Sequence, residues 1–217
     1  MVALATAAAL AASALAFVAI YSNSFGSKGA YKDVVRAGGS GKACERSWNK
    51  KNKLMRIDLD RGSGACTYKP PVQGDGPQPD HRFDAGGRIL KSTPGNIRDE
   101  AYLAAALRVG GGARYQLRVF PETGEFELRR KPTDVGFPVS GTDPAILEVG
   151  QRNLLRLIAE GNQIRAFVNG APLADVIDAN SGELNGTKVE FAVGSEADSR
   201  RNTVANFDKL RLAVPDP

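Results

Sequence analysis

Acidic residues at alternate positions of one strand could do glycosidase chemistry, because a retaining glycosidase needs two carboxylates about 5 Å apart. Two places in this sequence come near that pattern, namely Asp58 with Asp60, and the group Glu122, Glu125 and Glu127. The first pair adjoins a turn, and Glu127 is expected to pair with Arg118 across a hairpin. We therefore interpret both sets as solvated strand faces and predict no catalytic residue.

Other chemistries have few residues to draw on. A serine or cysteine nucleophile would need a histidine base, and His81 is the only histidine. It follows a proline-rich loop (KPPVQGDGPQPD, residues 69–80), so we expect it to be exposed. Asp75, Asp80 and Asp84 could offer oxygens to calcium, but their spacing matches no standard calcium loop. We predict no cofactor and no metal ligand, and leave calcium open.

Sugar-binding sites in proteins use aromatic platforms and planar polar side chains. The supply of aromatic platforms is thin and consists of Trp48, Tyr68, Tyr102 and Tyr115. The candidate ligand-binding residues are Trp48, Arg114, Gln116, Arg118, Glu127 and Arg129. For Trp48 the alternative is packing beneath a cysteine loop, and for the other five it is a merely solvated sheet face.

The segment ERSWNKKNKLMR (residues 45–56) gathers five basic residues around one tryptophan, in a chain whose net charge is +5. Such a cluster could attract nucleic acid or another anionic polymer by counterion release. Outside the cell an anionic wall polymer or a lipid head group is the more sensible partner, and a solvated loop is the alternative. We expect no nucleic-acid partner.

The elements that must position these residues are short strands. Candidate strands are 54–59, 102–109, 114–120, 125–130, 153–159, 163–168, 188–193 and 204–214. Turn sequences such as GGGA, PETG, EGN and NG separate them. Residues 98–107 (RDEAYLAAAL) could be helix or strand, and their composition alone favours helix. Many short strands at near-regular spacing predict an all-β antiparallel sandwich or barrel.

Two hairpins can be tested by pairing their residues. Across the PETG turn, Val119 would face Phe126 and Leu117 would face Leu128, while Arg118 meets Glu127 and Gln116 meets Arg129 on the other face. Across the EGN turn, Leu157 would meet Ala166 and Leu155 would meet Val168. At one register, apolar pairs lie on one side and polar pairs on the other, as a sheet with one buried face requires.

The N-terminal part carries no charge before Lys28. Residues 1–21 are expected to form a transmembrane helix or a signal segment, since about 20 apolar residues span a bilayer core. Ala14-Leu15-Ala16 could serve as a cleavage signal, but a basic n-region is missing, which favours an uncleaved anchor. Residues 22–43 are rich in glycine and serine and are expected to be a flexible linker before a domain at 44–217.

Topology follows from two opposed signals. Lys28, Lys32 and Arg36 after the apolar run would favour a cytoplasmic location by the positive-inside tendency. Cys44 and Cys66, however, have no metal-binding spacing and are best interpreted as a disulfide formed in an oxidising compartment. We give the cysteines more weight and expect a single-pass membrane protein with an extracytoplasmic domain, or a secreted protein after cleavage.

The C-terminal half of the sequence resembles a known family of domains. The order LLRLIAEGNQIRAFVNGAPLADV, VEFAVGS and NFDKLRLAV resembles concanavalin A-like (laminin-G-like) jelly rolls, nearest to bacterial 3-keto-disaccharide hydrolase and unknown-function domains. The matching residues are Asn153, Leu155, Gly161, Phe167, Asn169, Gly170, Phe207, Asp208 and Leu210. The resemblance implies a concanavalin A-like antiparallel β-sandwich (jelly roll). The apolar run of residues 1–21 would precede it as a hydrophobic helix.

The function expected from this sequence is a membrane-tethered, lectin-like module that binds a carbohydrate or cell-wall polymer without catalysis. The absence of a recognisable catalytic pair favours it over a glycan-processing hydrolase of the type that the family name implies. A protein-interaction module is the third alternative. The sequence leaves the oligomeric state open.

Overall fold

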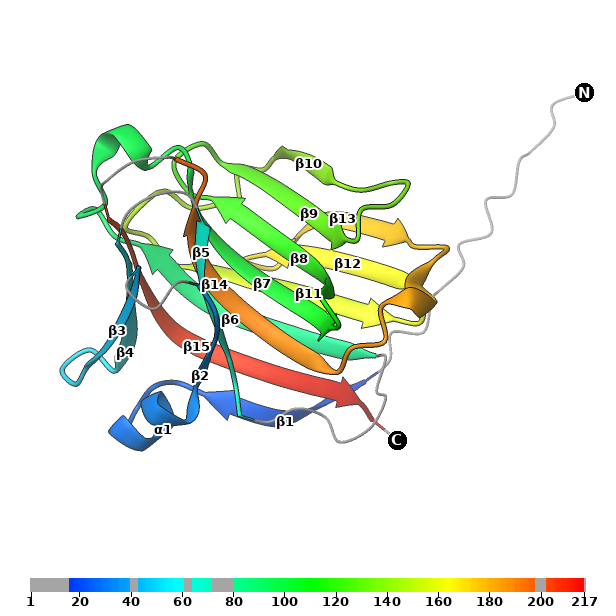
Figure 1. Cartoon of the computed structure of the whole chain (residues 1–217), viewed down its shortest axis with the longest axis horizontal. Coiled ribbons are helices and arrows are strands. Elements are labelled where there is room, and N and C mark those ends of the chain that lie inside the picture. The colour runs from blue at the N-terminus through cyan, green and yellow to red at the C-terminus, as the bar shows by residue number, and fades with distance from the viewer. Residues whose placement is uncertain (1–15, 40–42, 61–63, 72–79, 198–201, 217) are drawn as a thin grey trace, which may run out of the picture.

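The computed structural model describes residues 16–39, 43–60, 64–71, 80–197 and 202–216. In these ranges the chain forms two antiparallel sheets packed face to face, with one six-residue α-helix and two 3-10 turns (Figure 1). The helical segments are α1 Lys28–Asp33, η1 Gly95–Ile97 and η2 Ser181–Glu183. The predicted all-β antiparallel sandwich is confirmed.

Sheet A has eight strands in the order β13-β12-β11-β6-β15-β4-β3, and β1 also pairs with β15. Its strands are β1 Phe17–Asn23, β3 Cys44–Asn49, β4 Leu54–Leu59, β6 His81–Ile89, β11 Asn153–Glu160, β12 Gln163–Val168, β13 Ala171–Ile177 and β15 Thr203–Pro215. Neighbours in this sheet are mostly distant in sequence, so its order depends on long-range pairing.

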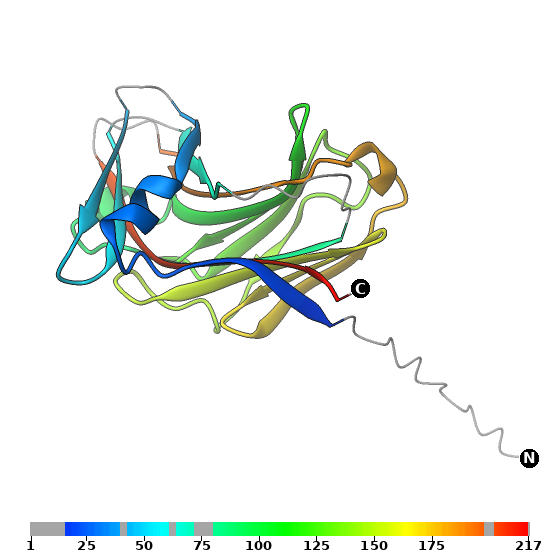
Figure 2. The same ribbon diagram turned by 90° about the horizontal axis from the view of Figure 1, so that it is seen from below.

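Sheet B has seven strands in the order β10-β9-β8-β7-β14-β5-β2. Its strands are β2 Val35–Gly38, β5 Gly64–Lys69, β7 Ala101–Gly110, β8 Ala113–Phe120, β9 Glu125–Lys131, β10 Val139–Thr142 and β14 Lys188–Ser195. Figure 2 shows the two layers from the side, with sheet A below and sheet B above. The outer face of sheet B is therefore one of the two broad surfaces of the molecule.

Both hairpins have the predicted registers. In the β8–β9 hairpin Leu117 pairs with Leu128, and Arg118 pairs with Glu127. In the β11–β12 hairpin the residue paired with Leu157 is Ala166. The inward residues of these strands enter one core between the sheets. In this core Phe191 of β14 and Phe207 of β15 pack edge to face, with 4.8 Å between their ring centres. The hydrophobic alternation thus sets which side chains remain on the outer faces.

The ambiguous segment 98–107 is mostly strand. Strand β7 begins at Ala101 and lies between β8 and β14, so it is paired on both sides. Its alanines favour a helix when they are considered alone. Pairing on both edges and burial on both faces outweigh that intrinsic preference, and the helical alternative is wrong for these residues.

The boundaries expected in the N-terminal part need correction. Residues 17–21, expected in the hydrophobic helix, lie in β1 and pair with β15. Residues 1–15 lie outside the described residues, and no described helix is long and apolar enough to cross a membrane. The segment 22–43 is not a free linker in the part that is described. It contains α1 and β2, and Phe25 and Val34 are fully buried in the core.

The predicted disulfide is present between Cys44 and Cys66. Cys44 begins β3 in sheet A and Cys66 lies in β5 of sheet B, so the bond joins the two sheets covalently. Both residues are buried in the core cluster. The bond therefore fastens the end of the sandwich that α1 and β2 also cover (Figure 1).

Candidate functional site

Five of the six predicted ligand-binding residues lie together on the outer face of sheet B. Cross-strand pairing of β8 with β9 sets Arg114 beside Lys131, Gln116 beside Arg129, Arg118 beside Glu127 and Phe120 beside Glu125. The alternate residues Tyr115, Leu117 and Val119 point into the core. The strand period of two therefore places these polar side chains on one face.

Two open pockets lie on this face, on either side of the Arg118–Glu127 pair. The first has a volume of about 410 Å³ and contains five carboxylates, and we call it the acidic pocket; its lining includes Asp99, Glu100, Glu125, Glu127, Glu196 and Phe120. The second has a volume of about 340 Å³ and is lined by Arg114, Gln116, Arg118, Arg129, Arg130, Lys131 and Thr133. We call it the basic pocket. The charge of the face thus changes sign along the strands.

Arg118 occupies the boundary between the pockets and is held from several sides. Its Nη1 atom lies 2.7 Å from Glu196 and 3.9 Å from Glu127, and its Nε donates to Gln116 at 3.1 Å. The guanidinium carbon lies 4.4 Å from the centre of the Tyr102 ring. Because only 15% of the side chain is exposed, Arg118 mainly organises its neighbours.

Glu190 lies on the same face, on β14 beyond β7. Its Oε2 is 3.3 Å from Nη1 of Arg114, and only 11% of its side chain is exposed. Burial raises the pKa of Glu190, although the nearby charges of Arg114, Lys69 and Lys188 act to lower that pKa. These lysines belong to β5 and β14, so basic residues extend across the sheet beyond the two strands that the sequence singled out.

The predicted aromatic platforms are not available on this face. Tyr68 and Tyr115 are buried in the core, and Tyr102 is 3% exposed beneath Arg118. Trp48 lies on β3 of sheet A, where its Nε1 donates to the carbonyl of Phe25 at 3.0 Å. Trp48 is therefore separate from the sheet B site, and its contact fits the alternative of structural packing.

The expectation of an exposed His81 is wrong. His81 is the first residue of β6 and is fully buried, and neither ring nitrogen has a hydrogen-bond partner within the described residues. Burial, together with the charge of Arg108, lowers the pKa of His81 to about 4, whereas the charge of Asp80 opposes this shift. The sequence missed this because the residues before His81 have loop composition while the strand period places His81 inward with Phe83.

The aspartates considered for calcium have other partners. Asp80 accepts from Arg108 at 3.4 Å and from the backbone nitrogen of Gly161 at 2.7 Å. Asp84 lies between Arg82 and Arg156 on the outer face of sheet A, and Asp75 lies outside the described residues. Within the described ranges no group of three or more His, Cys, Asp or Glu side chains is arranged to hold a metal ion.

The basic segment 45–56 is divided between β3, a turn and β4. Arg46 hydrogen-bonds to the carbonyl of Val34 and lies 4.9 Å from the centre of the Tyr31 ring. Arg56 pairs with Asp58 at 2.9 Å. These two arginines therefore have structural partners, and the segment forms no continuous site with the face of sheet B.

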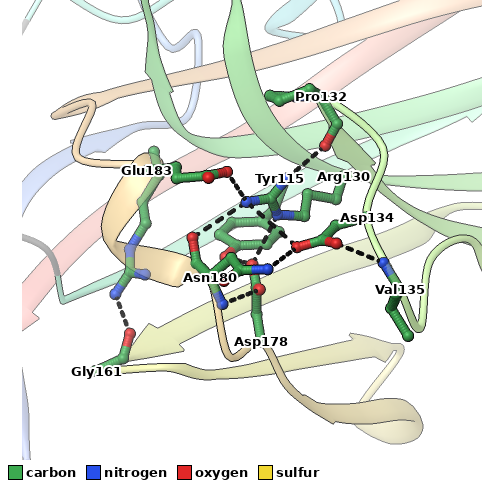
Figure 3. A network of polar contacts seen from close by, with 10 residues as sticks. Tyr115, Arg130, Pro132, Asp134, Val135, Gly161, Asp178, Asn180 and Glu183 are labelled. Atoms are coloured by element: carbon green, nitrogen blue, oxygen red, sulfur yellow. Dashed lines mark hydrogen bonds and ion pairs between the residues drawn. The ribbon is translucent and has the colours of Figure 1, made fainter.

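A second polar network lies inside the sandwich (Figure 3). Arg130, which points inward from β9, forms a 2.8 Å ion pair with Asp178, and Tyr115 donates its hydroxyl to the same carboxylate. Arg130 also pairs with Glu183 at 2.7 Å and donates to the carbonyl of Pro132 at 2.6 Å. Nearly all its donors are satisfied within the protein, so we interpret this network as structural.

The fold is that of concanavalin A-like, galectin-like carbohydrate-binding and glycan-active domains. A Bacillus subtilis protein of unknown function with a galectin-like fold has a TM-score of 0.62 at 12% identity, covering 93% of this chain and 100% of that chain. The carbohydrate-binding module CBM66 from Bacillus subtilis has a TM-score of 0.55 at 12% identity, covering 83% of this chain and 94% of that one.

Glycan-active enzymes share the same architecture. The catalytic domain of an endo-1,3-beta-glucanase (laminarinase) from Thermotoga petrophila has a TM-score of 0.58 at 8% identity, covering 94% of this chain and 100% of that one. No protein-family model matches the sequence, and no curated protein matches it. The predicted jelly-roll fold is confirmed, and identities this low establish the fold alone.

Proposed function

We propose that this protein binds a carbohydrate on the outer face of sheet B and does so without catalysis. The observation that carries the proposal is the pair of open pockets on that face, lined mainly by charged and polar side chains on neighbouring strands. Concave sites with convergent polar groups are the usual form of small-ligand sites. Carbohydrate-binding and glycan-active proteins among the structural neighbours support a glycan as the ligand.

The test is binding of the full chain to an array of glycans and cell-wall polymers, with two pocket-filling variants. Thr133 lines the basic pocket and Ser140 lines the acidic pocket, and both are exposed at the surface. We expect Thr133→Trp or Ser140→Trp to abolish a glycan signal. Ser47→Trp, on exposed β3 of sheet A, is the matched control. Absence of any glycan signal, or equal loss in the control, would refute the proposal.

A hydrolase is the second candidate function, favoured by one observation. Glu125 and Glu127 point to the same face of β9 and line the acidic pocket together with Glu196. Against it, Glu127 and Glu196 both lie within 4 Å of the Arg118 guanidinium, which balances their charge. Release of reducing ends from a glycan bound by the wild type, abolished by Glu127→Gln without loss of binding, would establish the enzyme instead.

We also propose that the sandwich lies outside the cytoplasm. The Cys44–Cys66 disulfide supports this location, because such bonds persist in oxidising compartments. The uncharged run before β1 comprises residues 2–16. This run is shorter than the roughly 20 residues that span a membrane, and its length is similar to that of the apolar region of a signal peptide. Cleavage after Ala14-Leu15-Ala16 would leave Phe17, the first residue of β1, as the new N-terminus.

The N-terminus of the protein recovered from a secreting host tests this processing. We expect an intact mass corresponding to residues 17–217 in the medium or periplasm. Replacing Ala16 by a bulky residue such as Phe should block cleavage there, whereas Ala19→Phe, inside β1, should not. A membrane-bound product with the uncleaved mass would establish the anchor that the sequence alone favours.

A further inference from the structure

Basic residues form a band across sheet B, perpendicular to its strands. Register sets Lys131 beside Arg114 and Arg129 beside Gln116. On the other side of β7, β14 places Glu190 beside Ala106 and Lys188 beside Val109. In the next strand, β5, Tyr68 pairs with Phe191, so the same register brings Lys69 beside Glu190. We call Lys69, Arg114, Arg129, Lys131 and Lys188 the basic band. Four strand spacings separate β9 from β5, which is about 19 Å.

The cations at the β8–β9 end of the band are accessible, and Lys69 and Lys188 are half-buried. The side chain of Arg129 is 42% exposed and that of Arg114 is 33% exposed, and Lys131 is exposed at the strand end. Among the described residues, Glu190 is the carboxylate that the register places in the same rows, and only 11% of its side chain is exposed. At the edge of the band, Arg129 also lies 3.5 Å from Glu127 and 3.9 Å from Glu196. The band therefore presents a row of positive charges to solvent.

At the other end of β8 and β9 from Arg114 and Lys131, the surface is negatively charged and would repel a polyanion. The acidic pocket carries five carboxylates, and it begins at Glu127, which pairs with Arg118, four residues or about 13 Å from Arg114 along β8. A chain with repeated negative charges would meet repulsion if it followed the strands. It meets only the basic band if it crosses them. The charge pattern thus selects one direction for such a ligand.

Among the described residues, this face also lacks exposed aromatic rings, which are the groups that usually hold neutral sugars by stacking. Tyr102 and Phe120 contact each other at 5.5 Å between ring centres, and they are 3% and 6% exposed. Recognition by ionic hydrogen bonds is what Arg114, Arg129 and Lys131 can supply. Guanidinium groups match the geometry of carboxylate and sulfate oxygens with two parallel hydrogen bonds.

We propose that the ligand is an anionic polysaccharide, carrying carboxylate or sulfate groups, that crosses the strands of sheet B along the basic band. This inference rests on the proposed carbohydrate-binding function. Each sugar acid is held by the cations nearest to it, and binding weakens as salt screens the charges. The acidic pocket remains outside the bound chain.

The test compares polygalacturonate and dextran sulfate with neutral dextran as probes, by affinity electrophoresis and calorimetry on the full chain. Arg129→Gln with Lys131→Gln removes two cations of the band that are exposed at its end. Lys209→Gln with Arg211→Gln removes two cations from β15 of sheet A, which is the matched control. We expect the first variant to lose at least about tenfold in affinity, as counterion release predicts, and the second to change less than about twofold.

Two further measurements test whether the charge of the band contributes the binding energy, and the sheet A control tests whether the position of the charges matters. The charge-preserving variant Arg129→Lys with Lys131→Arg should keep most of the affinity. The wild-type affinity should fall at least about tenfold between 50 and 200 mM salt, and the fall should be smaller in the Arg129→Gln/Lys131→Gln variant. Equal loss in the sheet A control would overturn the inference.

The outcomes distinguish this inference from the proposed function. If a neutral glycan binds, Thr133→Trp abolishes that binding and neither polyanion binds, the face binds carbohydrate and the inference is wrong. If no glycan of any charge binds, the inference and the proposed function fail together. If polygalacturonate binds but dextran sulfate does not, the inference stands, and the ligand is narrowed to carboxylated polysaccharides.

Discussion

Arg130 and Asp178 form an ion pair inside the sandwich, with 2.8 Å between Nε and Oδ2 and with side chains only 1% and 2% exposed. Burial acts to raise the pKa of Asp178, but hydrogen bonds from Tyr115 and Arg130 outweigh burial and hold that pKa below its usual value. The carboxylate therefore stays ionised in the folded protein. The pair connects β9 of sheet B with the segment after β13, which ends at Ile177.

Removing one partner of this pair should destabilise the protein strongly. Asp178→Ala leaves the buried Arg130 with Glu183, whose side chain is 61% exposed, as its nearest remaining carboxylate. We expect a loss of about 3 kcal/mol in the free energy of unfolding, measured in guanidinium chloride. The double variant Arg130→Met/Asp178→Leu should lose less, because no buried charge is left unpaired. A loss in the single variant below about 1 kcal/mol would mean that the pair acts like an exposed one.

His81 should make stability depend on pH between about 4 and 6.5. Its pKa of about 4 in the folded protein lies below the ordinary value of 6.5 because burial disfavours the charged ring, with Arg108 adding to the shift and Asp80 opposing it. Over this window the unfolded chain binds a proton that the folded protein does not. Stability is therefore complete above pH 6.5 and falls as the pH decreases towards 4, by about 3 kcal/mol.

The matched variant is His81→Leu, which removes the titrating group and keeps an apolar side chain of similar size. We expect the fall in the free energy of unfolding between pH 6.5 and 4.5 to disappear in this variant, measured by urea denaturation at fixed salt. Glu190, whose pKa is raised by burial, adds stability as the pH falls and does so equally in both proteins. Loss of the depressed carboxylates Asp84 and Asp178 by protonation belongs to lower pH, because their pKa values are below the ordinary range. An unchanged pH dependence in the variant would refute the assignment to His81.

Local pairing rules predicted the hairpins of this fold because each register is fixed by two alternating faces. Leu117 with Leu128 and Arg118 with Glu127 are set by residues close in sequence. The place of Asn169 was also predictable from a local pattern, because Asn-Gly is typical of a tight hairpin turn. It has a φ of 51° before Gly170, and its side chain accepts from the nitrogen of Leu154 at 2.8 Å and donates to the carbonyl of Ala145 at 2.8 Å. The turn predicted at NG is confirmed, since β12 ends at Val168 and β13 begins at Ala171.

The rest of the site depends on strand order, which alternation does not specify. Lys188 and Glu190 are outward on β14, and a period-two pattern is visible in KVEFAV. Nothing local indicates that β14 adjoins β7 or that Lys69 of β5 lies next to it. The predictions of an exposed His81 and of a flexible linker at 22–43 were wrong for a related reason. The composition of these segments favours loops, and burial against distant strands decided their conformation.

The disulfide gives a third prediction. Cys44 and Cys66 are 22 residues apart and join the two sheets. Closing a loop of this length stabilises a fold by about 3 kcal/mol through the entropy of the unfolded chain. Cys44→Ser/Cys66→Ser should therefore lower the unfolding free energy by about that amount, and reduction of the wild type should produce a similar loss. If the reduced wild type kept its full stability, the bond would have no structural role.

Gly194 gives the last prediction because it makes room for Tyr102. A Cβ at Gly194 would overlap the Tyr102 ring, which lies across β14 on the outer face of sheet B. Gly194→Ala should push the ring outward, displace Arg118 from its stacked position and cost about 1–3 kcal/mol by overpacking. Gly182→Ala is the control, since a Cβ there meets nothing within 4 Å. We expect thermal melts to show the loss at Gly194 only. If Gly194→Ala binds a glycan as tightly as the wild type, the Tyr102–Arg118 stack does not position the ligand-binding face.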